Sequence, residues 1–165
     1  MVIELDNIFN NEGTALAFHF CLDLSLASVG ANKPFPKPFE VEGKVFNKTS
    51  VVRMQATAVS TMHTQCDRCA GDINRRFEVP VDHILVTSLN DEDNDDFLLV
   101  ENLRLDLDPL ITEDIFLALP TKILCQDNCK GLCTNCGKNL NNGQCSCQKP
   151  VDPRLEALKQ ILDNQ

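Results

Sequence analysis

Eight of the nine cysteines in this 165-residue chain stand in four closely spaced pairs. The pairs are Cys66-x2-Cys69, Cys125-x3-Cys129, Cys133-x2-Cys136 and Cys145-x-Cys147, and Cys21 is left over. A short loop between two cysteines lets both sulfurs bind one metal ion, and zinc prefers four thiolate or imidazole ligands in a tetrahedron. The spacing therefore predicts zinc sites built from two pairs each. Such zinc would be structural, because four thiolates leave no open position for water or substrate.

The pairing of these cysteines has two solutions. The favoured one groups Cys133, Cys136, Cys145 and Cys147 as a compact knuckle, since the spacer GKNLNNGQ is short and flexible enough to fold back. The remaining group, Cys66, Cys69, Cys125 and Cys129, then ties the Cys-rich tail to the rest of the chain. The competing solution uses Cys129, Cys133, Cys136 and one of Cys145 or Cys147. A redox role for Cys66 and Cys69 is a further reading, but no βαβ pattern surrounds them.

The elements that must position these cysteines are predicted to be mostly strands. Apolar residues alternate with polar ones from Phe18 to Leu24, which is typical of a strand with one buried face. Segments 39–46 and 51–61 flank the polar four-residue link Asn47–Ser50 and predict a hairpin. A further pair of strands, 75–79 and 81–87, is separated by Pro80, which indicates an edge, a bend or a bulge because proline cannot donate to a ladder.

The remaining segments are loops and helices. Residues 25–38 contain three prolines close together and predict an exposed extended loop. Residues 89–96 carry five acids and no base, which predicts a solvated loop. A strand pattern resumes over 97–107, and Asp108-Pro109 predicts the start of a short helix that ends near Leu119.

We therefore expect a mainly β (α+β) fold: an antiparallel curved sheet or partly open barrel with a short helix, a zinc-knuckle-like segment and a C-terminal helix. The predicted domains are a β-rich body (1–120), a Cys-rich segment (121–150) and the C-terminal helix (151–165). The Cys-rich segment has so few apolar side chains that it needs a metal to hold its shape.

The net charge of −9 comes from a local excess of acid. Residues 89–119 hold ten acids and one base, whereas the Cys-bearing segments 33–88 and 120–165 each hold two more bases than acids. Each zinc bound by four thiolates would add about −2 to its segment. The basic residues near the cysteines are candidates for contact with RNA phosphates. They are Arg53, Arg68, Arg75, Arg76, Lys122, Lys130 and Lys138.

No catalytic motif is found in the sequence, so we expect a protein that is not an enzyme and takes no small-molecule substrate. There is no apolar run long enough to cross a bilayer and no signal-peptide pattern at the N-terminus. We therefore expect a cytoplasmic protein without a membrane partner. In that reducing compartment, cysteines bind metal more often than they form disulfides.

The order of these motifs resembles the bacterial YceD family, the large ribosomal RNA subunit accumulation proteins. The resemblance is carried by Cys66-x2-Cys69, LDLDPLITEDIFLALP (105–120), CQDNCKGLCTNCGKNLNNGQCSC (125–147) and VDPRLEALKQIL (151–162). It implies a non-enzymatic factor needed for accumulation or processing of 23S ribosomal RNA in ribosome biogenesis, with a link to a large-subunit ribosomal protein.

Three functional hypotheses remain open. The first hypothesis is that the chain binds ribosomal RNA, alone or with a ribosomal protein. Alternatively, its acidic region 89–114 recognises a basic ribosomal protein as an adaptor, without direct RNA contact. The third hypothesis is a thiol redox or metal-handling protein.

Overall fold

The computed structural model describes residues 1–30, 32–88 and 97–147. Two compact units divide the chain. Unit 1 consists of Met1–Thr64 and Asp72–Ile123, and unit 2 consists of Gln65–Gly71 and Leu124–Gln165. Residues 65–71 thus group with the Cys-rich segment, although they interrupt the β-rich body in the sequence. The predicted acidic loop 89–96 and the predicted C-terminal helix 151–165 lie outside the described residues.

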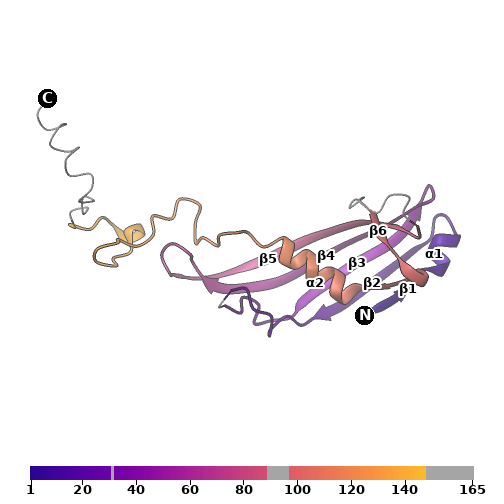
Figure 1. Cartoon of the computed structure of the whole chain (residues 1–165), viewed down its shortest axis with the longest axis horizontal. Coiled ribbons are helices and arrows are strands. Elements are labelled where there is room, and N and C mark those ends of the chain that lie inside the picture. The colour runs from indigo at the N-terminus through magenta and orange to yellow at the C-terminus, as the bar shows by residue number, and fades with distance from the viewer. Residues whose placement is uncertain (31, 89–96, 148–165) are drawn as a thin grey trace, which may run out of the picture. The chain divides into compact units, whose positions relative to one another are not determined.

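Unit 1 is built on a five-stranded sheet in the order β2-β3-β4-β5-β6 (Figure 1). The strands are β2 (Ala15–Leu22), β3 (Phe39–Lys48), β4 (Val51–Gln65), β5 (Asp72–Val86) and β6 (Phe97–Leu99). The pairs β2–β3 and β3–β4 are antiparallel, and β6 pairs with β5 in parallel over three residues. Among the described strands β2 and β6 are the two ends of the sheet. The predicted mainly β fold is confirmed, in the form of an open sheet and not a barrel.

The β3–β4 hairpin confirms the predicted strands and corrects the turn between them. Pairing continues to Lys48 opposite Val51, so the link has two residues and not four. Both of them, Thr49 and Ser50, have positive φ angles, 55° and 61°. Two left-handed residues form the type I′ turn that matches the twist of a hairpin.

The core of unit 1 lies between the sheet and α2 (Leu107–Leu117), which runs along the sheet in Figure 1. Along β4 every second side chain from Val52 to Thr64 is buried. The helix buries Leu107, Ile111 and Ile115 in the same core. The predicted helix is confirmed, but it begins at Leu107 and not at Asp108. Its N-cap is Asp106, whose carboxylate accepts the N–H of Asp108. Pro109 still lies in the first turn, where its missing N–H would have no helical acceptor.

A second, two-stranded sheet was not expected from the sequence. It pairs β1 (Val2–Glu4) with β7 (Arg104–Asp106), and α1 (Asp6–Asn10) follows β1. The strand predicted over 97–107 is broken between β6 and β7 by η1 (Glu101–Leu103). The break has a backbone cause, since Asn102 and Leu103 have φ angles of 52° and 54°. Pairing with β1 places Leu105 of β7 beside Ile3, and the burial of both apolar side chains stabilises the pair of strands.

Two loop predictions have mixed outcomes. The predicted strands 75–79 and 81–87 form one continuous strand, β5, so Pro80 does not separate two strands. The loop 25–38 is not uniformly exposed, because Phe35 is fully buried against Phe39 and Phe77.

Among the described residues, no helix has the length and apolar character needed to cross a membrane.

Unit 2 has almost no apolar core. Its buried residues in the described part are Cys66, Cys69, Cys129 and Gly131. Within its described residues, 65–71 and 124–147, the only regular elements are the short η2 (Leu140–Asn142) and an isolated bridge between Leu132 and Asn139. Because sulfur atoms occupy the place of a hydrophobic core, the shape of this unit depends on what the sulfurs bind.

Candidate metal centres

The first cluster consists of Cys66, Cys69, Cys125 and Cys129. Cys66 and Cys69 lie in the turn that follows β4. That turn is closed by hydrogen bonds from the Cys66 N–H to the Gly71 carbonyl (2.8 Å) and from the Ala70 N–H to the Cys66 carbonyl (2.9 Å). The other two ligands come from a second turn, in which the Cys129 N–H donates to the Gln126 carbonyl at 3.0 Å. Each Cys pair is thus fixed by its own backbone turn.

The sulfur positions of the first cluster fit a tetrahedral ion. The Sγ atoms of Cys66 and Cys129 are 3.7 Å apart, and those of Cys69 and Cys125 are 3.6 Å apart. All four sulfurs lie within 4.8 Å of one another. A tetrahedron with zinc–sulfur bonds of about 2.3 Å has edges of about 3.8 Å. The cluster therefore has the dimensions of a four-sulfur metal site without any rearrangement.

The thiols of the first cluster differ in acidity. Burial raises the pKa of Cys66, but N–H donors from the backbone of Arg68, Cys125 and Cys69 outweigh it and lower the pKa to about 6. The amide of Asn141 lowers the pKa of Cys129. The hydrogen bond to Cys129 raises the pKa of Cys125 to about 12. Neighbouring thiolates repel one another, so all four ionise together only around a cation.

The second cluster consists of Cys133, Cys136, Cys145 and Cys147, again with all sulfurs within 4.8 Å. The Sγ atoms of Cys133 and Cys145 are 3.3 Å apart. The Cys133–Cys136 pair lies in a turn closed by a bond from the Gly137 N–H to the Cys133 carbonyl, 2.9 Å. Donors from the backbone of Cys136 and Asn135 lower the pKa of Cys133 to about 6, whereas the hydrogen bond to Cys136 raises that of Cys147 to about 12.

The structure brings the eight cysteines together in the favoured grouping and not in the competing one. Cys21 lies on β2, exposed and outside both clusters. Either cluster could hold a metal ion. Four sulfurs around one ion leave no position for substrate, so the arrangement is suited to hold the chain and not to carry out a reaction.

Sequence reasoning missed the residues that support the first cluster. The Arg68 guanidinium donates to the Cys129 carbonyl at 2.9 Å and joins the two turns. Gly131 lies against the Arg68 carbonyl, where a Cβ atom would be 3.0 Å from the oxygen. Asn141 donates to the Cys129 sulfur at 3.3 Å. The Asn-rich spacer was the only sequence signal for Asn141, and it indicated flexibility.

The acidity difference in the second cluster gives a prediction for metal-free protein at about pH 7. We expect iodoacetamide to modify Cys133 before Cys147, although Cys147 is the more exposed side chain. The reason is that thiolates react and thiols do not. With a pKa of about 6 for Cys133 and about 12 for Cys147, Cys133 is the one of these two that is a thiolate at about pH 7. The rate at Cys133 should fall as the pH drops below 6. Peptide mapping by mass spectrometry measures both rates, and faster modification of Cys147 would contradict the assignment.

The candidate RNA-contact residues are all exposed, but they do not gather in one unit. Arg68, Lys130 and Lys138 belong to unit 2 and the other four to unit 1. Several are engaged within the protein: Arg53 with Asp82, Arg76 with Glu78, Arg68 with Cys129 and Lys138 with the Gln144 carbonyl. Within the described part of the chain, the side chains of Arg75, Lys122 and Lys130 make no ion pair or hydrogen bond.

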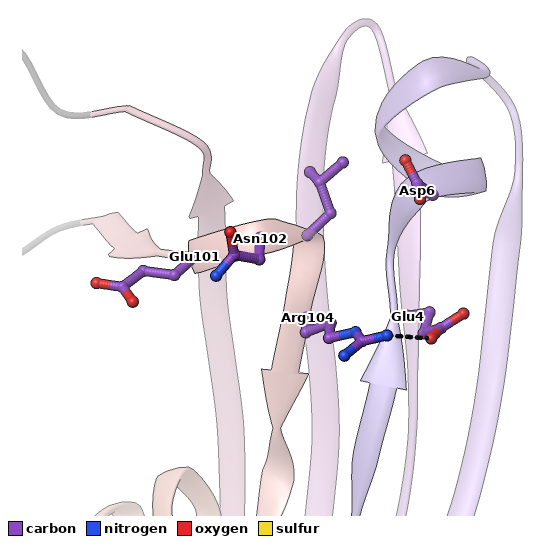
Figure 2. Close-up of a pocket in the computed structure, with 6 residues that line it drawn as sticks. Glu4, Asp6, Glu101, Asn102 and Arg104 are labelled. Atoms are coloured by element: carbon purple, nitrogen blue, oxygen red, sulfur yellow. Dashed lines mark hydrogen bonds and ion pairs between the residues drawn. The ribbon is translucent and has the colours of Figure 1, made fainter.

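Unit 1 also contains an acidic cleft of about 580 Å³ beside the small β1–β7 sheet. It is lined by Glu4, Asp6, Glu101, Asn102, Leu103 and Arg104. Figure 2 shows Arg104 paired with Glu4 at 3.1 Å, with Glu101 on one side and Asp6 on the other. The carboxylates of Asp6 and Glu101 make no ion pair with any described residue. The cleft therefore presents two uncompensated negative charges.

Comparison with known proteins places these clusters in a family context. The family described as "Large ribosomal RNA subunit accumulation protein YceD" matches residues 53–162. The uncharacterized protein YlbN of Bacillus subtilis is 29% identical over 128 residues, which are 76% of this chain and 74% of that protein. The uncharacterized protein Rv2926c of Mycobacterium tuberculosis is 25% identical over 127 residues, which are 74% of this chain but only 61% of that longer protein. No solved structure matches. Because the family match covers about two thirds of the sequence and all eight clustered cysteines, the chain belongs to the YceD family.

Proposed function

We propose that the chain is a non-enzymatic factor that promotes accumulation of 23S ribosomal RNA during ribosome biogenesis in the cytoplasm. In this proposal it acts by binding ribosomal RNA, a large-subunit ribosomal protein, or both. The observation that carries the proposal is the match to a family named for large-subunit ribosomal RNA accumulation, over a range that includes the whole described part of unit 2. Two closed cysteine clusters, which offer no substrate position, support a binding role over catalysis.

Zinc is the metal that the donor set of both clusters favours. Four thiolates in tetrahedral positions suit zinc, whereas calcium and magnesium prefer oxygen ligands. Cys66, Cys69, Cys125 and Cys129 would hold one ion, and the second cluster would hold another. Each ion would replace the missing hydrophobic core and keep the exposed side chains of unit 2 in fixed positions.

Direct RNA contact would depend on individual basic side chains, because each zinc with four thiolates carries about −2. Arg75, Lys122 and Lys130 are the best candidates for phosphate contact, since no partner within the described residues neutralises them. Arg68 and Lys138 serve the structure of unit 2 through bonds to backbone carbonyls. Without tryptophan or tyrosine the chain has few side chains on which bases could stack. We therefore propose recognition of the RNA backbone and not of base sequence.

Salt dependence of binding tests direct RNA contact. We expect the zinc-loaded chain to bind 23S ribosomal RNA fragments with an affinity that falls as salt rises, with a slope of log K against log salt of about −0.9 per phosphate contact. Lys130→Gln should make that slope shallower by about 1. Lys48→Gln is the matched control, because it removes one charge from an exposed position on β3 that is not a candidate contact. Fluorescence anisotropy measures both, and binding that is absent or insensitive to salt would contradict direct contact.

The acidic cleft supports the adaptor as the second candidate function. Asp6 and Glu101 could pair with lysine or arginine side chains of a basic ribosomal protein. If the adaptor is correct, Asp6→Asn combined with Glu101→Gln weakens binding of a purified basic large-subunit protein, and RNA fragments do not bind the chain. If RNA contact is correct, the same double variant leaves RNA affinity unchanged or slightly higher.

A further inference from the structure

Asn141 lies in the loop of one cysteine cluster and reaches a ligand of the other. In the sequence it stands between Cys136 and Cys145, so it belongs to the spacer of the second cluster. In the structure its side-chain amide donates to the sulfur of Cys129 in the first cluster, at 3.3 Å. A residue positioned by one metal site thus hydrogen-bonds a ligand of the other.

The remaining bonds of the Asn141 side chain also go to the first cluster. Its Oδ1 accepts the backbone N–H of Lys130 at 2.8 Å and the side-chain amide of Gln126 at 3.3 Å. Gln126 and Lys130 are the neighbours in sequence of Cys125 and Cys129. All three bonds therefore hold the turn that presents two of the four ligands of the first cluster.

The backbone of Asn141 is fixed by the spacer itself. Asn139 accepts the Asn141 N–H on its side-chain oxygen at 2.9 Å, and the Leu140 N–H donates to the Gly131 carbonyl at 2.9 Å. Leu140 is the only large apolar side chain in this spacer, so hydrogen bonds hold most of its shape. They include bonds from the Cys133 N–H to the Lys138 carbonyl at 2.9 Å and from Lys138 Nζ to the Gln144 carbonyl at 3.0 Å. Closing the loop between Cys136 and Cys145 around an ion would fix both ends of the spacer and reduce its freedom.

We propose that Asn141 is a positioning residue that couples the two clusters, so that metal binding at the second cluster strengthens metal binding at the first. The inference rests on the proposed binding of zinc by both clusters. An ion at the second cluster orders the spacer, and the ordered spacer places the amide donor on Cys129. By thermodynamic linkage, an ion at the first cluster strengthens binding at the second by the same factor.

The test uses the full chain, stripped of metal, reduced and titrated with zinc, with native mass spectrometry to count ions per chain. At one zinc per chain, two independent sites of equal affinity would give about half of the chains one ion. Coupling instead makes the one-ion form a minor species between the empty and the two-ion forms. An equal zinc dissociation constant for the first cluster in the wild-type chain and in the Cys145→Ser chain, whose second cluster is disabled, would overturn the proposal.

Asn141→Asp is the decisive variant, because it keeps the size and the oxygen acceptor but replaces the donor with a carboxylate that repels the thiolate. We expect the one-ion form to become the main species and the zinc dissociation constant of the first cluster to rise about 10- to 100-fold. Asn142→Asp is the matched control, since it introduces the same charge at the next residue, whose side chain is exposed and bonds no described residue. The control should behave as the wild type.

A double-mutant cycle separates coupling from simple damage to the first cluster. Cys145→Ser disables the second cluster and should weaken zinc binding at the first in a chain with Asn141, but should add little in a chain that already carries Asn141→Asp. Chelator competition gives the dissociation constants. If the two effects simply add, Asn141 does not carry the coupling, and the proposed metal sites stand without it. If the wild-type chain binds no zinc at all, the proposed metal sites fail as well.

Discussion

Replacing Cys129 by Ser is expected to reduce the zinc bound at saturation from two ions per chain to one. Cys129 is the best-protected sulfur ligand, with a relative exposure of 2%, and it accepts the Asn141 donor. A serine hydroxyl stays protonated at neutral pH and cannot replace a thiolate as a zinc ligand. Structural zinc contributes about 10–16 kcal/mol of apparent binding free energy in small zinc-dependent folds. Loss of the first ion should therefore leave residues 65–71 and 124–131 without a fixed structure.

Native mass spectrometry counts the ions, and limited proteolysis reports the expected loosening of the 124–131 segment. Cys21→Ser is the matched control, because Cys21 is exposed on β2 and lies outside both clusters. It should keep two ions and the proteolysis pattern of the wild-type chain. Two ions in the Cys129→Ser variant would contradict the assignment of Cys129 as a ligand.

Gly131→Ala is expected to weaken metal binding at the first cluster although it leaves all eight cysteines in place. Gly131 is buried with a φ angle of +74°, and an added Cβ atom would lie 3.0 Å from the Arg68 carbonyl oxygen. A left-handed conformation costs an L-residue about 1–2 kcal/mol. The contact with a backbone oxygen cannot be relieved by a side-chain rotation, and overpacking of this kind costs about 1–3 kcal/mol more. The zinc dissociation constant of the first cluster should rise accordingly, about tenfold for every 1.4 kcal/mol.

Gly137→Ala separates the two contributions to that effect. Gly137 has nearly the same φ angle, +70°, but a Cβ atom there would meet nothing within 4 Å. The Gly137 variant should therefore show only the backbone cost, and at the second cluster. Chelator competition compares the two variants. Equal losses in both would mean that the close approach of Gly131 to Arg68 does not support the first cluster.

The sequence was most informative where structure is local. Three of the four cysteine pairs lie in short turns of their own, so their spacing predicted which residues act together. The short spacer predicted that Cys133 to Cys147 fold back on themselves. The β3–β4 hairpin was predictable for the same reason, because alternation and a polar turn are local patterns. The spacing favoured the grouping that the structure shows but left the competing one open. That choice depends on a contact between distant residues. Cys66, in the turn between β4 and β5, lies 59 residues before Cys125, whose N–H donates to the Cys66 sulfur.

The features that sequence reasoning missed depend on contacts between distant segments. The β1–β7 pairing joins residues about 100 positions apart and brings Glu4 beside Arg104. It also adds Glu4 and Asp6 to an acidic region that the sequence located only in residues 89–114. Asn141 and Arg68 have ordinary polar and basic side chains. Their roles at the first cluster come entirely from the partners that the fold gives them.

The ratio of 23S to 16S ribosomal RNA in cells depleted of this protein tests the central claim most directly. The account predicts that the ratio falls on depletion, that the wild-type chain and Cys21→Ser restore it, and that Cys129→Ser, expressed at the same level, does not. That result would connect the cysteine clusters to large-subunit RNA accumulation. An unchanged ratio in depleted cells would contradict the proposed function.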